Sequence, residues 1–266
     1  MLQQTQVSRV LIKYPSFLKR FPSLKKLAQA RSSEVIRGWQ GMGYNNRAIR
    51  LRELAICLVR GLDGKMPETP VELGKLPGVG RYTANAVACF AFRKPVPVVD
   101  TNIERVLTRL YPDKLKHHRL RGRDSQVVWG VAEAILPRRR ASDWNQALMD
   151  LGALICTAAA PKCGICPVSK FCPSAHRPLR ATRSASKREP GRDGVPNRIY
   201  RGRVVEVLRN LGRGQRMRAP SLSRQIKPKF GRKDRPWFAR LLKDLQRDGL
   251  VRLTRKASTV YVSFPD

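Results

Sequence analysis

The chain has 266 residues and a formal net charge of +35, with 54 lysines and arginines against 19 acidic residues. A protein this basic repels itself unless a polyanion is close, so the composition favours a nucleic acid partner over an ordinary solvated surface. No stretch approaches the ~20 apolar residues of a membrane span, and no signal peptide is visible. We therefore expect a cytoplasmic protein, associated with the nucleoid if the source is bacterial or archaeal, in a compartment where stable disulfides are rare.

The chain up to residue 172 is predicted to be almost entirely helical. Apolar side chains recur near the helical period in five segments, and no alternating strand pattern competes with them. The predicted helices cover residues 7–21, 47–62, 81–92, 101–111 and 142–156. Pro15 should interrupt the first of these helices. The fourth should be capped by Asp100 or Thr101, and the fifth by Ser142 or Asp143.

The remainder of the chain changes character. Residues 174–198 are rich in proline, arginine, serine and glycine, which predicts a flexible basic linker. Three helices and a hairpin that turns at Lys256–Ser258 are then predicted, over residues 199–211, 221–226, 235–249 and 250–264. This order is that of a winged helix, a helix-turn-helix variant whose third helix can enter a major groove. A protein-docking module of the same shape is the alternative, and the positive charge favours DNA.

Four cysteines stand in a C-x6-C-x2-C-x5-C array, at Cys156, Cys163, Cys166 and Cys172. Four thiolates within one short loop indicate a metal site, because disulfides are rare in the expected compartment. Zinc sites usually contain two Cys-x2-Cys pairs, whereas this array has one pair with longer arms, which favours a [4Fe–4S] cluster and leaves zinc as the alternative. Cys57 and Cys89 lie on apolar helix faces and are expected to be core thiols.

A second pattern is the stretch "LPGVGRYTANAV". Gly78 and Gly80 bracket a tight turn between two predicted helices, where backbone N–H groups and the next helix N-terminus can approach a phosphate. A plain interhelical turn is the alternative, and the basic Arg81 favours DNA. Asp100 follows an apolar run and opens a helix twenty residues after Gly80. Taken alone, it is better explained as an N-cap aspartate.

These patterns in this order resemble the endonuclease III / MutY superfamily of helix-hairpin-helix–Gly/Pro–Asp DNA glycosylases. "MLQQTQV", "GMGYNNRA", "MPETPVEL", "LPGVGRYTA" and "WNQALMDLGALICT" are most similar to the MutY adenine glycosylases. The resemblance ends at residue 172. It implies a mainly α helix-hairpin-helix glycosylase fold over residues 1–173, with the cluster loop at 156–172. The linker (174–198) and a small winged-helix-like α+β domain (199–266) would follow.

The resemblance implies a mechanism. The target base is flipped out of the duplex and its N-glycosidic bond is hydrolysed. In MutY a Glu protonates the adenine and an Asp stabilises the oxocarbenium-like sugar. Asp100 matches that Asp, and Asn102 matches an active-site Asn. Tyr82 occupies the position at which strand-cleaving relatives carry a Schiff-base lysine, which implies a monofunctional enzyme because a phenol forms no Schiff base.

The resemblance also assigns contacts and a cofactor. Gln3 and Gln4 match the amides that fill the gap left by the flipped base, and Tyr44 matches the aromatic wedged beside the opposing purine. The cysteines match the ligands of a [4Fe–4S] cluster. The remaining DNA contacts implied are Gly78, Gly80, Arg81, Lys162 and Lys170. The partner would be double-stranded DNA with a mismatch or lesion, bound by a monomer.

Several departures from the family keep alternatives open. The family's catalytic Glu lies two residues before the Met of "MLQQTQV", so we expect either that Met1 is an internal methionine or that the chain lacks its general acid and is impaired. The family's 8-oxoguanine-recognition domain is replaced, Thr101 stands where MutY usually has Gly, and Asn45 where it often has Tyr. The expected function is a monofunctional base excision repair glycosylase for adenine opposite guanine or 8-oxoguanine. A thymine/uracil mismatch glycosylase and a non-catalytic DNA-binding protein are the alternatives.

Overall fold

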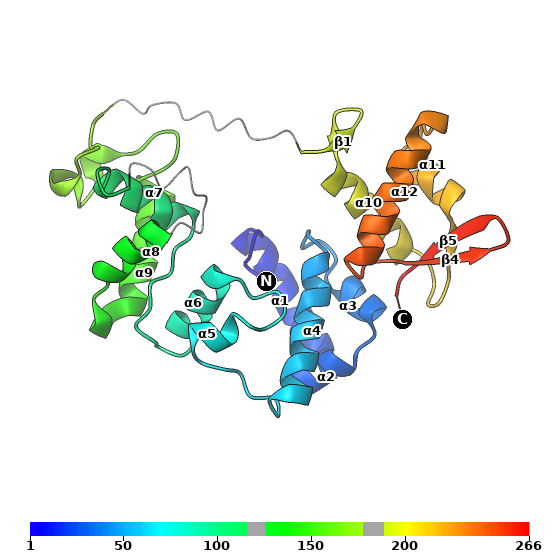
Figure 1. The fold of residues 1–266 in the computed structure, drawn as a ribbon, viewed down its shortest axis with the longest axis horizontal. Helices are drawn as coiled ribbons and strands as arrows, with labels where there is room; N and C mark the ends of the chain where they lie inside the picture. Colours follow the sequence, from blue (N-terminus) through cyan, green and yellow to red (C-terminus); the bar gives the residue numbers. More distant parts are fainter. Residues whose placement is uncertain (116–125, 178–188, 266) are drawn as a thin grey trace. The chain divides into compact units, whose positions relative to one another are not determined.

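The protein divides into two compact units in the computed structural model (Figure 1). The structure describes residues 1–115, 126–177 and 189–265. Unit 1 comprises Met1–Lys65 and Ser184–Asp266, and unit 2 comprises Met66–Arg183. In these described ranges no helix combines the length and the apolar character that crossing a bilayer requires.

The N-terminal part of unit 1 consists of four helices. They are α1 (Val7–Arg20), α2 (Leu24–Gln29), α3 (Ser32–Gly38) and α4 (Asn46–Gly61). The Ser23 side chain caps α2 by accepting a hydrogen bond from the backbone N–H of Lys26. The buried apolar side chains that hold the four helices together include Phe17, Phe21, Leu27, Val35, Trp39, Met42 and Ala55. The loop between α3 and α4 is therefore fixed by core residues on both sides.

Pro15 lies inside α1, so the expected interruption of this helix is wrong. A proline removes only one N–H from the helix, and Pro15 lies on an exposed side. Ser16 Oγ donates to the Lys13 carbonyl 2.9 Å away, which satisfies a neighbouring acceptor. The helix buries Val10 and Phe17, whereas an apolar row on another face stays exposed, made of Val7, Leu11, Tyr14 and Leu18.

The C-terminal part of unit 1 contains the three helices and the hairpin predicted there. The helices are α10 (Asn197–Arg209), α11 (Ala219–Ile226) and α12 (Arg235–Arg247), and the hairpin is β4 (Arg252–Lys256) with β5 (Thr259–Ser263). A short strand that the sequence did not reveal, β3 (Met217–Arg218), pairs with β5, so the antiparallel sheet has the order β3-β5-β4. With only two residues, β3 carries no alternation to detect.

The expected linker over 174–198 ends earlier than predicted. Residues 178–188 lie outside the described part of the chain, but β1 (Gly191–Arg192) and β2 (Val195–Pro196) form an antiparallel hairpin before α10. Asp193 and Gly194 make its turn with left-handed φ values of 50° and 76°. Those conformations suit aspartate and glycine, so a stretch whose composition is typical of a linker closes a tight turn instead.

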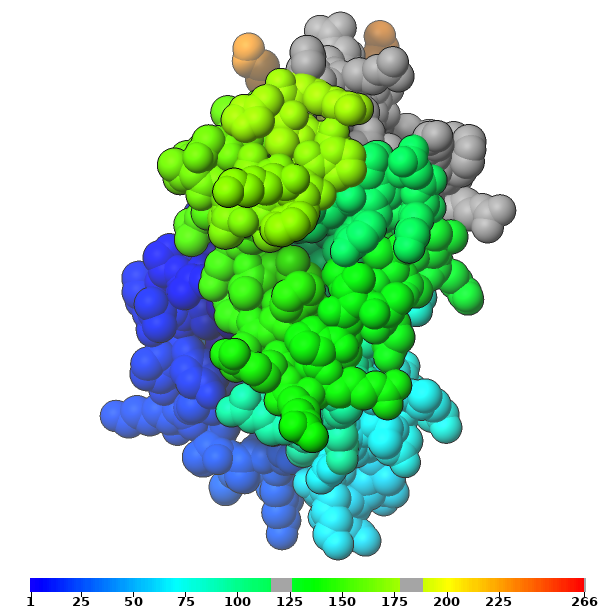
Figure 2. All heavy atoms as spheres, turned by 90° about the vertical axis from the view of Figure 1, so that its left-hand side faces the viewer, coloured from blue at the N-terminus to red at the C-terminus, as the bar shows by residue number. Residues whose placement is uncertain are grey.

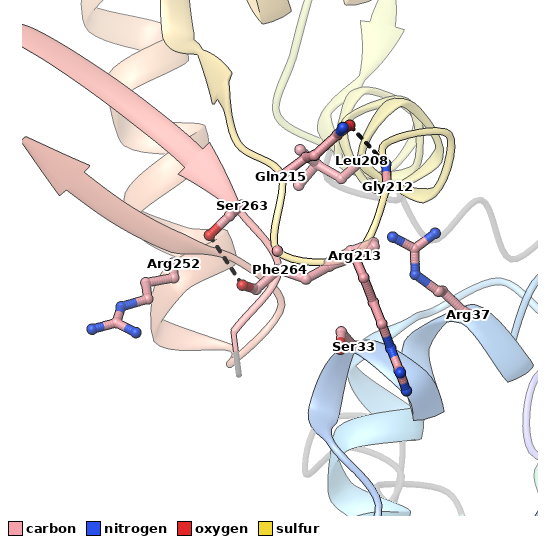
Figure 3. Close-up of a pocket in the computed structure, with 10 residues that line it drawn as sticks. Ser33, Arg37, Leu208, Gly212, Arg213, Gln215, Arg252, Ser263 and Phe264 are labelled. Carbon is pink, nitrogen blue, oxygen red and sulfur yellow. Dashed lines mark hydrogen bonds between the residues drawn. The ribbon is translucent and has the colours of Figure 1, made fainter.

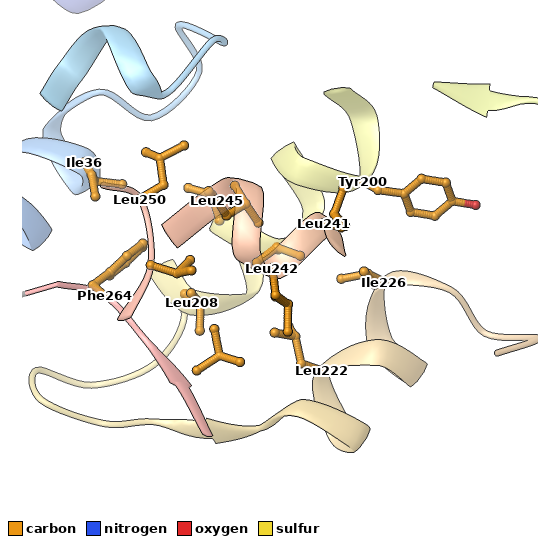
Figure 4. Packing of buried hydrophobic residues seen from close by; sticks show 14 of the residues in the cluster. Ile36, Tyr200, Leu208, Leu222, Ile226, Leu241, Leu242, Leu245, Leu250 and Phe264 are labelled. Atoms are coloured by element: carbon orange, nitrogen blue, oxygen red, sulfur yellow. The ribbon is translucent and has the colours of Figure 1, made fainter. Parts of the chain in front are cut away.

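One hydrophobic core joins the two parts of unit 1 (Figure 4). Ile36 of α3 and Ile49 of α4 belong to the same buried cluster as Leu245, Leu250 and Phe264. Figure 4 shows Ile36 near Leu250, with Phe264 from the chain end facing the same cluster. The C-terminal elements are therefore packed onto α3 and α4, and this contact-based grouping differs from the domain limits drawn on the sequence.

Unit 2 carries the remaining helices. They are α5 (Pro70–Leu73), α6 (Arg81–Phe90), α7 (Thr101–Leu110), α8 (Gln126–Ala134) and α9 (Ala141–Asp150), followed by a π-helical turn, η3 (Leu151–Ile155). The helix predicted over 142–156 is thus two elements. Its predicted caps are wrong, because α9 begins at Ala141 and Asp143 lies in its first turn, 3.4 Å from Arg140 Nε.

Candidate active site and DNA-contact residues

Asp100 is the N-cap of α7. Its Oδ1 accepts hydrogen bonds from the backbone N–H groups of Asn102 (2.8 Å) and Ile103 (2.7 Å). Its Oδ2 accepts from Asn102 Nδ2 at 3.0 Å. The positive end of the helix dipole favours a negative charge at this place. Three donors therefore hold the half-buried carboxylate in one orientation. The predicted catalytic role of Asp100 is compatible with its role as the N-cap.

Tyr82 lies in the first turn of α6, within the electrostatic reach of Asp100. Burial raises the pKa of the Tyr82 phenol, and the negative charge of Asp100 raises it further. The phenol therefore remains protonated around neutral pH, while 38% of the side chain is exposed. Unit 2 brings together the three residues for which a catalytic role was predicted, namely Tyr82, Asp100 and Asn102.

An arginine connects this group to the cysteine segment. Arg105 Nη2 donates to Asn102 Oδ1 at 2.9 Å and also to the Gly152 carbonyl, while Arg105 Nε donates to the Cys156 carbonyl at 2.8 Å. Gly152 of η3 lies so close to α7 that a Cβ there would be 2.7 Å from Asn102 Cβ. The orientation of Asn102 is thus fixed from one side by Asp100 and from the other by Arg105.

The four cysteines of the array line one cavity. Its other walls are mainly apolar and include Val106, Leu110, Leu151, Ile155 and Val168. Arg109 Nη1 lies 3.1 Å from Cys156 Sγ and also donates to the Cys156 and Thr157 carbonyls. Burial raises the pKa of the Cys172 thiol, and negative charge on the other three cysteines raises it further. The segment forms a compact lobe in space-filling view (yellow-green in Figure 2).

The spacing of these thiols bears on the kind of metal site. Among the described residues, no three His, Cys, Asp or Glu side chains are placed to hold a single metal ion. A zinc ion needs all four sulfurs within about 2.3 Å of one point. The four thiols therefore line one cavity without converging on the position of a single ion.

The turn between α5 and α6 has the geometry of an anion site. Gly78 adopts a left-handed φ of +76°, which glycine tolerates best. Gly80 is the N-cap of α6 with an ordinary φ of −86°, and space beside it is open, so only Gly78 is required by its conformation. Gly80 has no side chain with which to cap α6. Arg81 is exposed, and its guanidinium lies 4.1 Å from the centre of the Trp129 ring.

The other predicted DNA contacts of the N-terminal region lie together in unit 1. Thr5 Oγ1 donates to the Met42 carbonyl at 3.0 Å, so the segment with Gln3 and Gln4 lies beside the α3–α4 loop that carries Tyr44. Gln4 and Tyr44 have left-handed φ values of 54° and 43°. Non-glycine residues in this region are uncommon and often mark functional sites. Half of the Tyr44 side chain (49%) is exposed.

Comparison with known proteins agrees with these features. Residues 1–129 match the HhH-GPD superfamily of base excision DNA repair proteins. The adenine DNA glycosylase of Mycobacterium tuberculosis (strain H37Rv) is 40% identical over 212 residues, which cover 79% of this chain and 67% of that protein. The chain belongs to the HhH-GPD superfamily of base excision DNA repair proteins. It is a DNA glycosylase, a hydrolase of N-glycosidic bonds.

Three further matches place this glycosylase among its relatives. The human adenine DNA glycosylase is 43% identical over 184 residues, 66% of this chain and 32% of that protein. A thermostable thymine-DNA glycosylase of known structure is 31% identical, with a TM-score of 0.61, and covers 65% of this chain and 79% of that one. An endonuclease III–DNA covalent intermediate reaches a TM-score of 0.57 at 27% identity. The helix-hairpin-helix glycosylase fold and a DNA partner, both predicted from sequence, are confirmed.

Two residues in contact with Asn102 were missed by sequence reasoning, Arg105 and Gly152. Arg105 lies three residues after Asn102 and four before Arg109, so all three share one face of α7. That spacing was a usable signal. Gly152 gave none, because its close approach to Asn102 depends on how η3 packs against α7. Lys162 and Lys170 are exposed on the cysteine segment, as phosphate contacts require.

Proposed function

We propose that this glycosylase hydrolyses the N-glycosidic bond of adenine opposite guanine or 8-oxoguanine and leaves the DNA strand intact. The identity with adenine DNA glycosylases, 40% to the mycobacterial and 43% to the human protein, supports the choice of adenine. The observation that carries the chemistry is the Asp100 carboxylate, held by three hydrogen bonds at the start of α7 beside the Tyr82 phenol.

The fixed carboxylate gives a mechanism for bond breaking. When the base leaves, positive charge develops on the sugar, and the negative charge of Asp100 stabilises it. Because the three donors already orient Asp100, no reorganisation is needed as the charge appears. Tyr82 provides no amine for a covalent intermediate, so water completes the reaction and the strand is not cut.

Asp100→Asn tests this mechanism, because it keeps the shape and removes the charge. Excision should be measured under single-turnover conditions. We expect the rate to fall by roughly 10²–10³ or more. Affinity for product DNA should change little, since Gln3, Gln4 and Tyr44 are untouched.

Three outcomes would contradict the proposal. An unchanged rate in Asp100→Asn would remove the role of this carboxylate. Strand cleavage with a borohydride-trappable intermediate would refute the monofunctional role assigned to Tyr82. Binding to mismatched duplexes with no excision of any base would favour the non-catalytic DNA-binding alternative.

A thymine or uracil mismatch glycosylase is the second candidate. The 31% identity to a thymine-DNA glycosylase, of which 79% is covered, favours it, and Tyr82 is compatible with both. A panel of duplexes with A:8-oxoguanine, A:G, T:G and U:G pairs separates the two. Faster release of thymine or uracil than of adenine would establish the second candidate.

We also propose that the cysteine segment holds a [4Fe–4S] cluster, bound by Cys156, Cys163, Cys166 and Cys172. The shared cavity with apolar walls and the guanidinium of Arg109 beside Cys156 support this assignment. Thiolates carry negative charge that the half-buried Arg109 offsets. The cluster would order the segment and so hold Lys162 and Lys170 toward the DNA backbone.

Finally, we propose that the C-terminal elements from α10 to β5 act as a winged helix that contacts duplex DNA. The order of three helices and a wing, with the strand order β3-β5-β4, supports it. So does a groove of about 670 Å³ between α11, α12 and the wing. Four cations and no carboxylate line this groove, namely Arg224, Arg232, Arg235 and Lys243. Four cations along a groove without carboxylates favour contact with phosphate groups.

A further inference from the structure

The loop between α3 and α4, residues 39–45, is held at both ends by one arginine of α10. Arg209 Nη2 donates to the Ile36 carbonyl (2.9 Å) in the last turn of α3 and to Asn45 Oδ1 (2.8 Å) immediately before α4. Arg209 Nε also donates to the Ile36 carbonyl, and Nη1 donates to Glu206 Oε2 at 2.8 Å. Only 7% of the Arg209 side chain is exposed. The guanidinium thus connects the entry of the loop to its exit.

A second arginine, Arg37 of α3, makes the reciprocal contact to the end of α10. Arg37 of α3 donates through Nη1 to the Arg209 carbonyl and through Nη2 to the Leu211 carbonyl at 2.7 Å, where α10 ends. Helix C-termini leave carbonyl groups without intrahelical partners and carry partial negative charge. Each helix therefore has its end satisfied by an arginine of the other, which fixes α10 against the point where the loop begins.

A third contact reaches into the loop itself. Gln40 Nε2 donates to Glu206 Oε1 at 2.6 Å, and the other oxygen of Glu206 binds Arg209. Glu206 and Arg209 thus form one polar group on α10 with contacts at the start, inside and at the end of the loop. Asn45 makes no capping bond to α4, so Arg209 is the hydrogen-bond partner that orients its side chain.

The opposite side of the loop is bound by the N-terminal region. Trp39 Nε1 donates to the Gly43 carbonyl at 3.1 Å, and Thr5 Oγ1 donates to the Met42 carbonyl. Tyr44, with its left-handed backbone, lies between these contacts and Asn45. A strained conformation persists only where its surroundings determine it, and here α10 supplies part of those surroundings.

A cavity lies beside these contacts. Its volume is about 230 Å³, and Arg37, Leu208, Gly212 and Phe264, which Figure 3 labels, line it. Leu208 also belongs to the buried core of unit 1, so the packing of α10 holds the core together while the hydrogen bonds orient the loop. Truncating one of these polar side chains should therefore shift the loop without unfolding the core.

We infer that Arg209 and Glu206 are positioning residues for Tyr44, through which the C-terminal elements set how the glycosylase discriminates the base opposite the one it removes. The inference rests on the proposed function and on the family resemblance, which predicts that Tyr44 lies beside the opposing base. Asn45 accepts the hydrogen bond from Arg209, so the position of α10 determines the position of Asn45 and of the neighbouring Tyr44.

The test measures affinity for duplexes in which an abasic-site analogue faces guanine, adenine, cytosine or thymine. The ratio of affinities for guanine and cytosine gives the discrimination, and 2-aminopurine fluorescence opposite the analogue reports stacking on Tyr44. We expect Arg209→Ala and Asn45→Ala each to lower the ratio by about threefold to tenfold, which is the net effect of losing one ordinary hydrogen bond. The double variant should lose no more than Arg209→Ala alone, because Arg209→Ala already removes the contact that Asn45→Ala removes.

Two variants serve as controls. Arg213→Ala also removes a cation that links α3 to the chain after α10, through Glu34, but its side chain is 71% exposed and lies away from the loop. It should lower overall affinity slightly and leave the ratio unchanged. Asn45→Asp keeps an acceptor for Arg209 and should retain the ratio. Should Arg209→Ala fail to fold, Asn45→Ala decides, because it removes only the acceptor.

The outcomes separate the inference from the proposed function. If Tyr44→Ala lowers the ratio and both Asn45→Ala and folded Arg209→Ala leave it intact, the inference is wrong and the role of Tyr44 stands. If Tyr44→Ala leaves the ratio unchanged, the role of Tyr44 in the proposed function fails as well. If Arg213→Ala lowers the affinity ratio as much as Arg209→Ala, the loss of one positive charge explains the effect and the inference is wrong.

Discussion

At Gly152, η3 and α7 approach so closely that no side chain fits. A methyl group there would lie 2.7 Å from Asn102 Cβ and 3.1 Å from the Asn102 carbonyl carbon and oxygen. We expect Gly152→Ala to destabilise unit 2 by about 1–3 kcal/mol and to slow excision, because backbone cannot move aside as a flexible side chain can. Thermal unfolding and single-turnover kinetics measure the two effects.

Gly130→Ala is the matched control for this change. Gly130 lies exposed within α8, and nothing lies within 4 Å of the added methyl group. Alanine is the better helix former, so this variant should be neutral or stabilising by roughly 0.4–1 kcal/mol. Equal behaviour of the two variants would mean that the close approach of η3 to α7 does not hold Asn102.

Single residues differed in how far the sequence could predict them. Asp100 was predictable both as an N-cap and, through the family resemblance, as an active-site carboxylate, since both depend on local sequence. Arg209 was not, because its partners Ile36 and Asn45 lie more than 160 residues away in the chain. Periodicity identifies the face of a helix but not what covers it.

At the scale of elements, the helices with long apolar patterns were predicted well and their ends were not. The stretch 142–156 has one continuous apolar pattern, yet α9 gives way to the π turn η3, which the pattern cannot distinguish from an α-helix. The π turn bears on function, because it ends at Cys156, whose carbonyl accepts from Arg105 and Arg109.

The cysteine segment provides a test of the proposed cluster. The purified protein should be brown and contain iron, and Cys166→Ser should lose iron and DNA affinity together, because the exposed Lys162 and Lys170 depend on an ordered segment. Iron content, visible absorbance and binding of product DNA measure this. A colourless protein with one equivalent of zinc would contradict the cluster assignment. Cys57→Ser lies outside the array and serves as the control, which should retain iron.

Asp234, before α12, gives a prediction about pH. A hydrogen bond from the Gly231 N–H, together with Lys227 and Arg192, lowers the pKa of Asp234 from 3.8 to about 2. A carboxyl whose pKa is lower in the folded state stabilises the fold above its unfolded pKa, and this contribution is lost as the pH falls from about 4 to 2. The unfolding midpoint should drop in that window. Asp234→Asn should be less stable at neutral pH and show a shallower drop.

At the scale of the whole molecule, the grouping of residues 1–65 with 184–266 could not be predicted. Ile49 was recognisable as part of an apolar helix face, but its packing partners include Leu250 and Phe264 from the end of the chain. Domain limits drawn from composition assume that neighbours in sequence are neighbours in space. Here the apolar faces of α3 and α4 are covered by elements from beyond unit 2.

The net charge of +35 leads to a prediction about salt. Affinity for duplex DNA should fall steeply with salt concentration, since each neutralised phosphate adds about 0.9 to the slope of log K against log salt. Replacing Arg235 and Lys243 with alanine should reduce that slope by up to about 2 and weaken all sequences alike. Arg139→Ala with Arg140→Ala, outside the groove, is a charge-matched comparison. Equal slopes for the two pairs would argue for a protein-docking module.

The shared core of unit 1 has a consequence for the order in which the protein can fold during synthesis. Ile36 and Ile49 are synthesised early, but their partners Leu250 and Phe264 follow more than 200 residues later in the chain. At roughly 5–20 residues per second, the first segment waits on the order of 10–40 s with an apolar face uncovered. Met66–Arg183 can complete its own contacts meanwhile. A nascent chain stalled before α12 should therefore protect unit 2 from protease while α3 and α4 remain open to chaperones, and only synthesis of the elements from α12 to β5 would close that surface.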